Sequence, residues 1–213
     1  MKSISLLPRH LLRYLRFQLI DGPRGAGRPV PTAALDGEYV GGHWDHFFGR
    51  EELPRQAVLA ALIREWFPQP PRVLDLGCGS GRLASLFRSD ETARWLGVDL
   101  SREGLARART LGLAHAEFQE GNFESWRPQG ELFDSIVFNE CIGYAVMPAD
   151  TLAAFAPYLA PHGRFFLSHF RFGNWAAQWR ALERVAPTEF ACTVGVTSNK
   201  IWDLRVLAPR YAP

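Results

Sequence analysis

The sequence predicts an α/β protein with a doubly wound, mostly parallel sheet of seven strands, a C-terminal antiparallel hairpin strand and helices on both faces. Short apolar segments alternate with helical segments of about 10–15 residues, which is typical of strand–helix–strand units in a parallel sheet. A glycine-rich turn follows the first of these strands. Near the end of the chain, two extended segments joined by Thr197-Ser198-Asn199-Lys200 predict the hairpin.

Each element follows from this periodicity. The expected parallel strands are residues 72–76, 94–99, 116–120, 135–139 and 164–169, and the expected hairpin strands are residues 190–196 and 201–207. The expected helices are residues 54–67, 81–88, 101–110, 149–159 and 175–185. In the first of these helices Val58, Leu62 and Trp66 share one side.

The first 55 residues differ in character from the rest. We expect a short basic amphipathic helix, because leucines recur at helical spacing on one side and arginines on another. These residues are Leu7, Leu11, Leu12, Leu15 and Leu19, with Arg9, Arg13 and Arg16. Such a helix packs on its own domain or lies on an anionic membrane or a partner. A glycine- and proline-rich linker, residues 22–31, follows it. The predicted units are an N-terminal helix and aromatic lid segment, residues 1–55, and a main domain, residues 56–213.

Composition restricts the class of protein. With 213 residues, a net charge of +2 and 47% hydrophobic residues, the chain predicts one globular domain with an extra segment and no general affinity for nucleic acid. Its isolated cysteines, Cys78, Cys141 and Cys192, favour a reducing compartment over a disulfide framework or a zinc site. No apolar run reaches the ~18 residues of a membrane span. We therefore expect a cytoplasmic protein with no metal and no stable membrane insertion.

The turn after the first strand is the first candidate site. Gly77, Cys78, Gly79 and Gly81 lie between that strand and the next predicted helix. Glycines in such a turn let main-chain N–H groups approach a ligand closely. The dinucleotide version of the turn needs a small residue where Arg82 stands, which disfavours a nicotinamide-dependent oxidoreductase.

Polar residues also end the next three strands. Asp99 follows the first glycine by a little over twenty residues, where a carboxylate can accept both hydroxyls of a ribose. Asn122, beside Phe123, ends the third strand, where an amide can hydrogen-bond an adenine edge, and Asn139-Glu140 ends the fourth. Each residue alone could cap a helix or a turn. Because the carboxyl ends of parallel strands share one crevice, the four together indicate a ligand site.

Four segments resemble the motifs of class I S-adenosylmethionine-dependent methyltransferases: residues 73–84, 97–101, 133–140 and 159–167. The resemblance covers residues 72–170 closely and the C-terminal hairpin loosely. It implies S-adenosyl-L-methionine as cofactor, S-adenosyl-L-homocysteine as product, and a Rossmann-like methyltransferase domain over residues 56–213. His162 departs from the family pattern by replacing a glycine, and Asn122 stands where many members carry an aspartate.

The resemblance also implies roles for individual residues. Asp75 and the turn holding Gly77, Cys78, Gly79 and Gly81 would bind the methionine part of the cofactor, Asp99 would bind the ribose, and Leu100 would pack on the adenine. Asn122 would meet the adenine amino group, and Phe123 and Asn139 are the remaining residues expected to bind the cofactor. Residues 37–55 resemble an aromatic segment that closes over the cofactor in small bacterial methyltransferases. Tyr39, Trp44 and Phe48 would do so here, or they are core aromatics of a docked helix.

The candidates for catalysis follow strands four and five. His169 is the first choice as general base, because the normal pKa of histidine lies near neutrality. Its alternative is a partly buried histidine bonded to backbone. Glu140 would bind an acceptor amine or form an ion pair with an arginine, and Tyr144 is the third candidate. His43 and His46 of the N-terminal segment are further options.

The expected function is methyl transfer to nitrogen or oxygen of a small-molecule acceptor. Only a helix and the hairpin remain after strand five, so no large substrate domain is inserted, and the expected acceptor site is aromatic. Two alternatives stay open: a degenerate cofactor-binding domain that acts as a scaffold or regulatory partner, and a methyltransferase with an RNA or protein acceptor. No arginine-rich stripe interleaved with aromatics indicates nucleic acid. The oligomeric state is not predicted.

Overall fold

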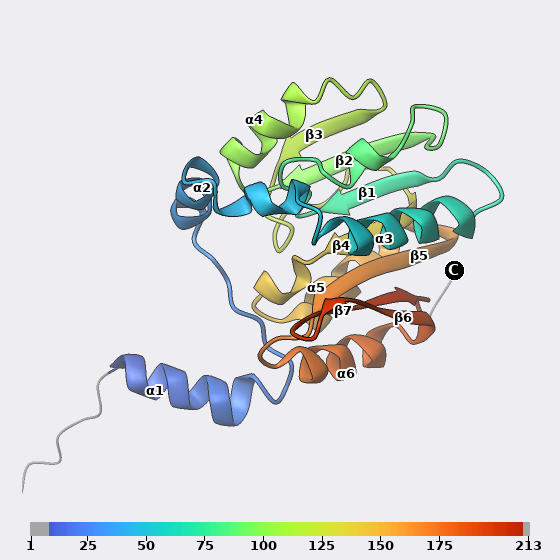
Figure 1. The fold of residues 1–213 in the computed structure, drawn as a ribbon. Coiled ribbons are helices and arrows are strands. Elements are labelled where there is room, and N and C mark those ends of the chain that lie inside the picture. Colours follow the sequence, from blue (N-terminus) through green and yellow to red (C-terminus); the bar gives the residue numbers. More distant parts are fainter. Residues whose placement is uncertain (1–8, 211–213) are drawn as a thin grey trace, which may run out of the picture.

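The computed structural model describes residues 9–210, and within them seven strands form one mixed sheet in the order β3-β2-β1-β4-β5-β7-β6 (Figure 1). The strands are β1 Arg72–Leu76, β2 Arg94–Asp99, β3 Ala116–Glu120, β4 Phe133–Asn139, β5 Leu159–Phe170, β6 Thr188–Thr197 and β7 Lys200–Leu207. Strands β1 to β5 pair in parallel, and β7 pairs antiparallel with both β5 and β6. The predicted fold class is confirmed.

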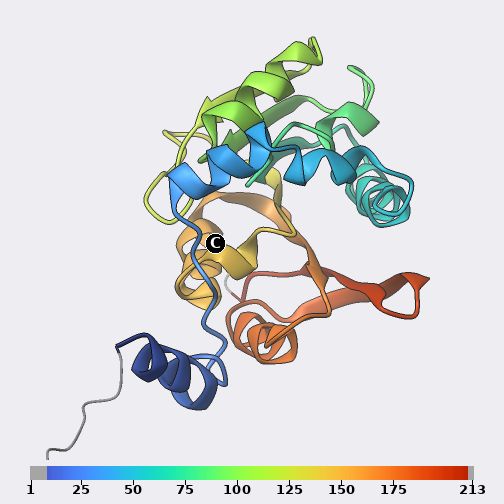
Figure 2. The same ribbon diagram turned by 60° about the vertical axis from the view of Figure 1, so that its left-hand side comes forward.

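Helices cover both faces of this sheet (Figures 1 and 2). The α-helices are α1 Arg9–Arg16, α2 Thr32–Val40, α3 Leu53–Trp66, α4 Arg102–Thr110, α5 Pro148–Phe155 and α6 Trp175–Val185. Short helical turns are η1 Phe17–Asp21, η2 His43–Phe48, η3 Ala84–Leu86, η4 Ile142–Tyr144 and η5 Ala156–Tyr158. Helices α5 and α6 pack on one face, and α3 with η3 packs on the other.

The central strands are apolar on both sides and therefore serve two hydrophobic clusters. In β4, Phe138 lies in the cluster with α5 and α6, whereas its neighbour Val137 lies in the cluster with α3. This division follows from the two-residue period of a strand. Phe165 and Phe166 of β5 divide in the same way, and all four side chains are fully buried. Burying side chains of this size stabilises the fold by about 1.5–3 kcal/mol each.

The prediction of a helix at residues 81–88 is wrong. Only the three-residue turn η3 forms there. Gly81 has a φ of +74°, which a right-handed helix does not accept, and Phe87 is already extended. The strand expected at residues 164–169 begins earlier, at Leu159, and its pairing with β4 shifts register near Phe133.

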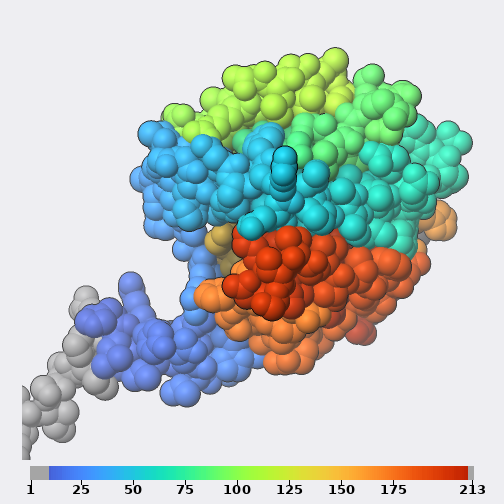
Figure 3. All heavy atoms as spheres, viewed as in Figure 1, coloured from blue at the N-terminus to red at the C-terminus, as the bar shows by residue number. Residues whose placement is uncertain are grey.

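Helix α1 confirms the predicted amphipathic helix over residues 9–16, and Leu7 lies outside the described residues. The helix does not pack on its own domain: it stands off the body of the molecule, as Figures 1 and 3 show. Leu12, Leu15 and Leu19 are accordingly exposed. Within residues 9–210, no helix is both long enough and apolar enough to cross a bilayer.

The segment predicted as a linker, residues 22–31, connects η1 to α2, and its first half is docked on the main domain. Asn174 Nδ2 donates hydrogen bonds to the carbonyls of Gly22 and Ala26, at 3.1 and 2.8 Å. Gly27 N donates to Val146 O, and a Cβ on Gly27 would lie only 2.1 Å from the carbonyl of Ala145. Glycines here permit close packing of backbone on backbone, not flexibility. The boundary predicted at residue 55 falls inside α3, and the division into two units stays a prediction.

Candidate active site

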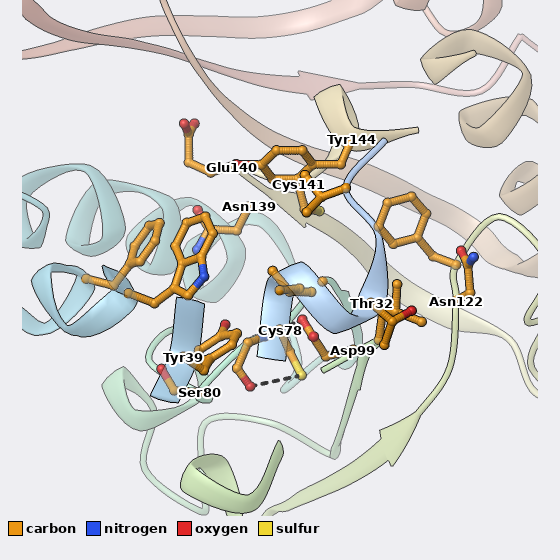
Figure 4. Close-up of a pocket in the computed structure, with 18 of the residues that line it drawn as sticks. Thr32, Tyr39, Cys78, Ser80, Asp99, Asn122, Asn139, Glu140, Cys141 and Tyr144 are labelled. Atoms are coloured by element: carbon orange, nitrogen blue, oxygen red, sulfur yellow. Dashed lines mark hydrogen bonds between the residues drawn. The ribbon is translucent and has the colours of Figure 1, made fainter. Parts of the chain in front are cut away.

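A cavity of about 340 Å³ lies at the carboxyl ends of the parallel strands, beneath α2 and η2 (Figure 4). Its floor is the turn after β1 together with the ends of β2 and β4. Its cover is the segment from Pro29 to Thr32 followed by α2 and η2. The cavity lies where ligands bind in open α/β sheets.

The glycine turn forms the floor through backbone geometry. The N–H groups of Gly77 and Cys78 both donate to the carbonyl of Val98, which ties the turn to β2. Gly77 and Gly79 have φ values of +67° and +54°, a conformation that strains any residue with a side chain. A Cβ on Gly79 would also lie 2.5 Å from the hydroxyl oxygen of Tyr39. The turn therefore needs glycine for both its shape and its space.

Asp99 lines the cavity, and its two carboxylate oxygens have separate partners. Oδ2 accepts from Gly79 N and Oδ1 accepts from Ser101 N, both at 2.8 Å. Burial raises the pKa of Asp99, and these backbone N–H donors oppose that effect. Each carboxylate oxygen has a second lone pair, so Asp99 can still accept hydroxyl donors from a ligand.

Two of the predicted cofactor residues, Asp75 and Gly81, do not line the cavity. Asp75 lies behind the turn, fully buried, and neither of its carboxylate oxygens has a hydrogen-bond partner. Burial raises the pKa of Asp75 well above its usual range, and the negative charge of Asp99 adds to the effect. Gly81 is needed for packing, because a Cβ there would lie 3.0 Å from Phe118 and 3.1 Å from Ala108.

The cover is held on helix α4 by polar contacts. Ser101 Oγ, at the N-cap of α4, donates to Asp36 Oδ1 at 2.6 Å. One turn from the end of α4, Arg107 donates to the carbonyl of Tyr39 and to the carboxylate of Asp45. The buried Tyr39 ring lies against Gly104 of the same helix. These contacts place the aromatic cover directly over the glycine turn.

Of the predicted aromatic residues, Tyr39 and Trp44 line the cavity, as does Phe47, and Phe48 does not. Phe48 instead lies half-exposed against the guanidinium of Arg82, whose carbon is 5.1 Å from the ring centre. Tyr39 and Trp44 are 6.0 Å apart between ring centres, in a tilted arrangement. The two rings can thus face a ligand together.

Leu100, Asn122, Phe123 and Asn139 all line the cavity, from the ends of β2, β3 and β4. Asn122 Oδ1 accepts from Glu124 N, which closes a tight turn and leaves the amide nitrogen for a ligand. Asn139 Oδ1 accepts from Arg55 and from Ser168 Oγ. These bonds use only the amide oxygen, which leaves the amide nitrogen for a ligand. The adenine and methionine roles expected for these residues stay predictions.

Glu140 and Tyr144 line the cavity at its other end, where the Glu140 carboxylate points away from the Tyr144 ring and from Asp99 (Figure 4). Glu140 has a φ of +64°, a strained conformation for a residue with a side chain. Its Oε2 accepts from Phe170 N at 3.1 Å, while its buried Oε1 has no partner. Burial raises the pKa of Glu140, although the charges of Arg55 and His169 oppose the shift. Burial also raises the pKa of Tyr144, to about 12.

The other candidate bases lie outside the cavity lining. The His169 ring is hydrogen-bonded through Nε2 to Gln178 Oε1 on α6, with the Trp179 ring 5.9 Å away. Successive strand residues alternate between faces, and His169 follows Ser168, which points to Arg55. His43 and His46 are exposed on η2, with His46 Nδ1 bonded to the carbonyl of His43.

Cys78 and Cys141 also line the cavity. Burial raises the pKa of both thiols well above the usual range, so neither forms a thiolate at neutral pH. Cys141 Sγ donates to Leu76 O at 2.9 Å, which is a packing role. Among the described residues, no three His, Cys, Asp or Glu side chains cluster so as to hold a metal ion.

Several lining residues have no signal in the sequence pattern. They are Pro29, Val30, Pro31, Thr32, Leu35, Phe47, Gln56, Ser80, Arg82, Leu83 and Glu124. Gln56 is the most informative, because it is fully buried on α3 and its Oε1 has no partner. A polar residue on the buried side of that helix was the only available hint. The buried Nε1 of Trp44 is also without a partner.

These unpartnered atoms match the groups of S-adenosylmethionine. The indole N–H of Trp44 is a donor for a carboxylate, and Gln56 Oε1 is an acceptor for an ammonium group. Asp99 provides carboxylate oxygens for the ribose hydroxyls. The glycine turn lines the same cavity and brings main-chain N–H groups close to a ligand. The residues present therefore fit the cofactor that the sequence motifs imply.

Comparison with known proteins agrees with this geometry. The methyltransferase domain family matches residues 48–192. A trans-aconitate 2-methyltransferase of Streptomyces coelicolor is 36% identical over 115 residues, which cover 51% of this chain and 38% of that protein. A ubiquinone biosynthesis O-methyltransferase of Aromatoleum aromaticum is 35% identical over 103 residues, which cover 46% of this chain and 43% of that protein. This chain thus spans less than half the length of these two relatives.

The fold also matches a solved structure, the N-methyltransferase NodS from Bradyrhizobium japonicum in complex with S-adenosyl-L-homocysteine. The TM-score is 0.70 at 17% identity, over 84% of this chain and 98% of that chain. The chain belongs to the class I S-adenosylmethionine-dependent methyltransferase family, whose cofactor is S-adenosylmethionine. The nicotinamide-dependent alternative is set aside.

Proposed function

We propose that this chain transfers a methyl group from S-adenosylmethionine to a nitrogen or oxygen of a small-molecule acceptor. The observation that carries the proposal is the covered cavity. From the glycine turn and Asp99 it continues to Tyr144 and Glu140, under the segment from Pro29 through η2. A cavity covered in this way suits an acceptor that enters whole, whereas a folded RNA or protein needs an open surface.

The binding residues would orient the two reactants and exclude water. When bound, S-adenosylmethionine supplies a methyl group on a cationic sulfur, which becomes a neutral leaving group as the methyl is transferred. Asp99 and the glycine turn would fix the nucleoside end, and the Tyr39 and Trp44 rings would cover it. Holding reactants in line supplies much of the acceleration in such a displacement.

Glu140 is the residue we propose as general base for an acceptor that must lose a proton. It lines the cavity, and its raised pKa makes the carboxylate a better proton acceptor than an exposed glutamate. Its buried Oε1 has no protein partner and would reach the acceptor by rotation of the side chain away from Phe170 N. Tyr144, with a pKa of about 12, stays protonated at neutral pH and would donate a hydrogen bond to the acceptor. His169 would act only after its bond to Gln178 is broken.

The charges of the lining favour a neutral or amine-bearing acceptor. Among the described residues that line the cavity, Arg82 is the only arginine or lysine, and it stands beside the glycine turn. The carboxylates of Asp99, Glu124 and Glu140 also line it. A polycarboxylate would meet these acids with only Arg82, at the cofactor end, as a cation to pair with, at a large desolvation cost. We therefore propose a phenol or amine, and not a tricarboxylate, as the acceptor. The cysteines, which form no disulfide, suit the cytoplasm as the compartment.

The test is acceptor-dependent formation of S-adenosylhomocysteine, preceded by calorimetric titration of the cofactor. Asp99→Ala removes the oxygens proposed for the ribose, so its affinity should fall about 10–100-fold, as expected for charge-assisted hydrogen bonds. Asp90→Ala, at an exposed carboxylate paired with Arg88, is the matched control and should bind normally.

Acceptor panels of phenols, primary amines, a tricarboxylate and total RNA then separate the alternatives. Turnover with a phenol or an amine supports the proposal. Turnover with the tricarboxylate or with RNA would contradict the acceptor assignment. Tight cofactor binding without turnover on any panel would favour the scaffold alternative.

A further inference from the structure

Helix α1 and η1 carry exposed apolar side chains that nothing in the described chain covers. Leu12 is 47% exposed, Leu15 37%, Leu19 73% and Ile20 45%. Figure 3 shows this part of the chain standing off the body. Single exposed leucines are ordinary on protein surfaces, but several on one short projecting helix are typical of an interaction site.

The charge of the same segment is strongly one-sided. Helix α1 contains Arg9, Arg13 and Arg16 and no acidic residue. The one carboxylate of the segment, Asp21, pairs with Arg16 at 2.9 Å. A short helix with leucines on one side and arginines beside them matches an anionic lipid surface, where the arginine stems reach past the apolar face to the headgroups.

The segment is joined to the body by a fixed connection. Beyond the bonds from Asn174, Gln178 Nε2 donates to the carbonyl of Ala26 at 3.2 Å. The guanidinium carbon of Arg28 lies 4.5 Å from the ring centre of Phe17, which packs η1 against the chain that follows. The docked connection continues into Pro29–Thr32, the edge of the cavity. Exposed apolar side chains, Val146 and Phe172, lie on the loops that hold it.

We propose that residues 9–21 form a docking surface for an anionic lipid bilayer, which would hold the enzyme at the membrane with its cavity edge beside the headgroups. A second copy of the chain is a poorer occupant. Pairing two such helices would bring arginines together, and the few exposed leucines bury far less than the ~800 Å² per partner of a stable interface. One short helix predicts reversible, peripheral binding, distinct from membrane insertion.

Cosedimentation with vesicles tests the proposal on the full chain. Wild type should bind vesicles of phosphatidylcholine with phosphatidylglycerol, bind phosphatidylcholine alone much more weakly, and release as salt increases. Arg13→Gln with Arg16→Gln should weaken binding about 30-fold, from about 1 kcal/mol for each cation at an anionic surface. Leu12→Glu with Leu15→Glu and Leu19→Glu should abolish it.

The matched control is Arg88→Gln with Arg102→Gln, which removes two exposed arginines elsewhere and should leave vesicle binding unchanged. Cofactor affinity reports folding in every variant, because no residue of α1 or η1 lines the cavity. Equal binding to neutral and anionic vesicles, no binding to either, or binding retained by the leucine variant would overturn the proposal. So would a wild-type dimer by light scattering that the leucine variant loses.

Discussion

Asp75, one residue before the end of β1, and Asp99, at the end of the neighbouring strand β2, differ in their partners. Asp99 accepts two backbone hydrogen bonds and faces the cavity, whereas Asp75 is fully buried without a partner. An ionised carboxylate in that position is energetically unfavourable, and the pKa of Asp75 is therefore raised toward the neutral, protonated form. This carboxyl group therefore destabilises the cofactor-free fold.

Asp75→Asn should accordingly stabilise the cofactor-free protein at neutral pH. The folded-state pKa of Asp75 is raised, so its contribution to stability falls as pH rises from its unfolded value of about 4 through the folded value. Asparagine does not ionise, so the variant does not lose this stability as pH rises. We expect the variant to gain about 1 kcal/mol at neutral pH, seen as a rise of roughly 2–4 °C in the unfolding temperature. The gain should vanish near pH 4, and a pH-independent difference would contradict the assignment.

Glu140→Gln tests the proposed base. Loss of a general base typically lowers turnover by about 10²–10⁴-fold. In wild type, kcat should rise with pH through the pKa of Glu140, which lies above its ordinary value, because the carboxylate is the active form. The variant should lose this limb of the pH profile.

Glu117→Gln, at an exposed carboxylate on β3, is the matched control and should leave turnover unchanged. His169→Asn should keep the rise of kcat with pH that is assigned to Glu140. If His169→Asn removes the limb and Glu140→Gln keeps it, the roles are reversed.

Among single residues, the sequence correctly predicts the site residues that lie at strand ends, because the path of the backbone alone places them there. Asp99, Asn122 and Asn139 follow strands, and a strand end locates its side chain without further information. The side that a residue faces is harder to predict, as His169 shows: its bond to Gln178 depends on how α6 packs. Gln56 belongs to the lining only because α3 crosses the sheet near the cavity.

Among the elements, the cover depends on one residue of α4. Arg107 bonds both the carbonyl of Tyr39 and the carboxylate of Asp45, with its guanidinium carbon 5.8 Å from the Tyr39 ring centre. Arg107→Gln should loosen α2 and η2 and lower affinity for S-adenosylhomocysteine about 10-fold, mainly through faster dissociation. Stopped-flow fluorescence of the tryptophans near the cavity would measure the rate.

The control is Arg102→Gln on the same helix, which pairs with Glu120 in solvent and forms no hydrogen bond or ion pair with the described residues of the cover. Its dissociation rate should match wild type. Equal dissociation rates for the two variants would indicate that a change in α4 itself, and not the lost contact with the cover, speeds dissociation.

Elements with strong local patterns were predictable. The bounds of β1, β2 and β3 agree with the strand prediction, because turns bound each of these short segments. The turn at residues 81–88 was not, since the positive φ of Gly81 and the extended backbone of Phe87 leave room for a single helical turn only. Docking of residues 22–31 was also hidden, because glycine allows both a free linker and tight packing, and tertiary contacts decide between them.

Across the whole molecule, a buried cation ties the N-terminal third to the strand ends. Arg55 is fully buried on α3, between the Phe47 and Trp202 rings at 5.6 and 5.7 Å. It bonds Glu52 Oε2 at 2.8 Å, Ser168 Oγ on β5 at 3.1 Å, and Asn139 on β4. No local sequence signal distinguishes Arg55 from the exposed arginines.

Arg55→Met should therefore cost about 3–5 kcal/mol of unfolding free energy, because the buried carboxylate of Glu52 loses its cation. Adding Glu52→Gln should recover much of that cost, since the double variant removes both members of this buried ion pair, and the part not recovered reflects Glu140, which also loses the charge of Arg55. Urea unfolding of the single and double variants measures the coupling. Arg94→Met, which breaks two surface ion pairs of a side chain that is 44% exposed, should cost at most about 1 kcal/mol. A double variant less stable than Arg55→Met would show that Glu52 stabilises the fold through partners other than Arg55. In that case the ends of β4 and β5 are held independently of the Glu52–Arg55 pair on α3.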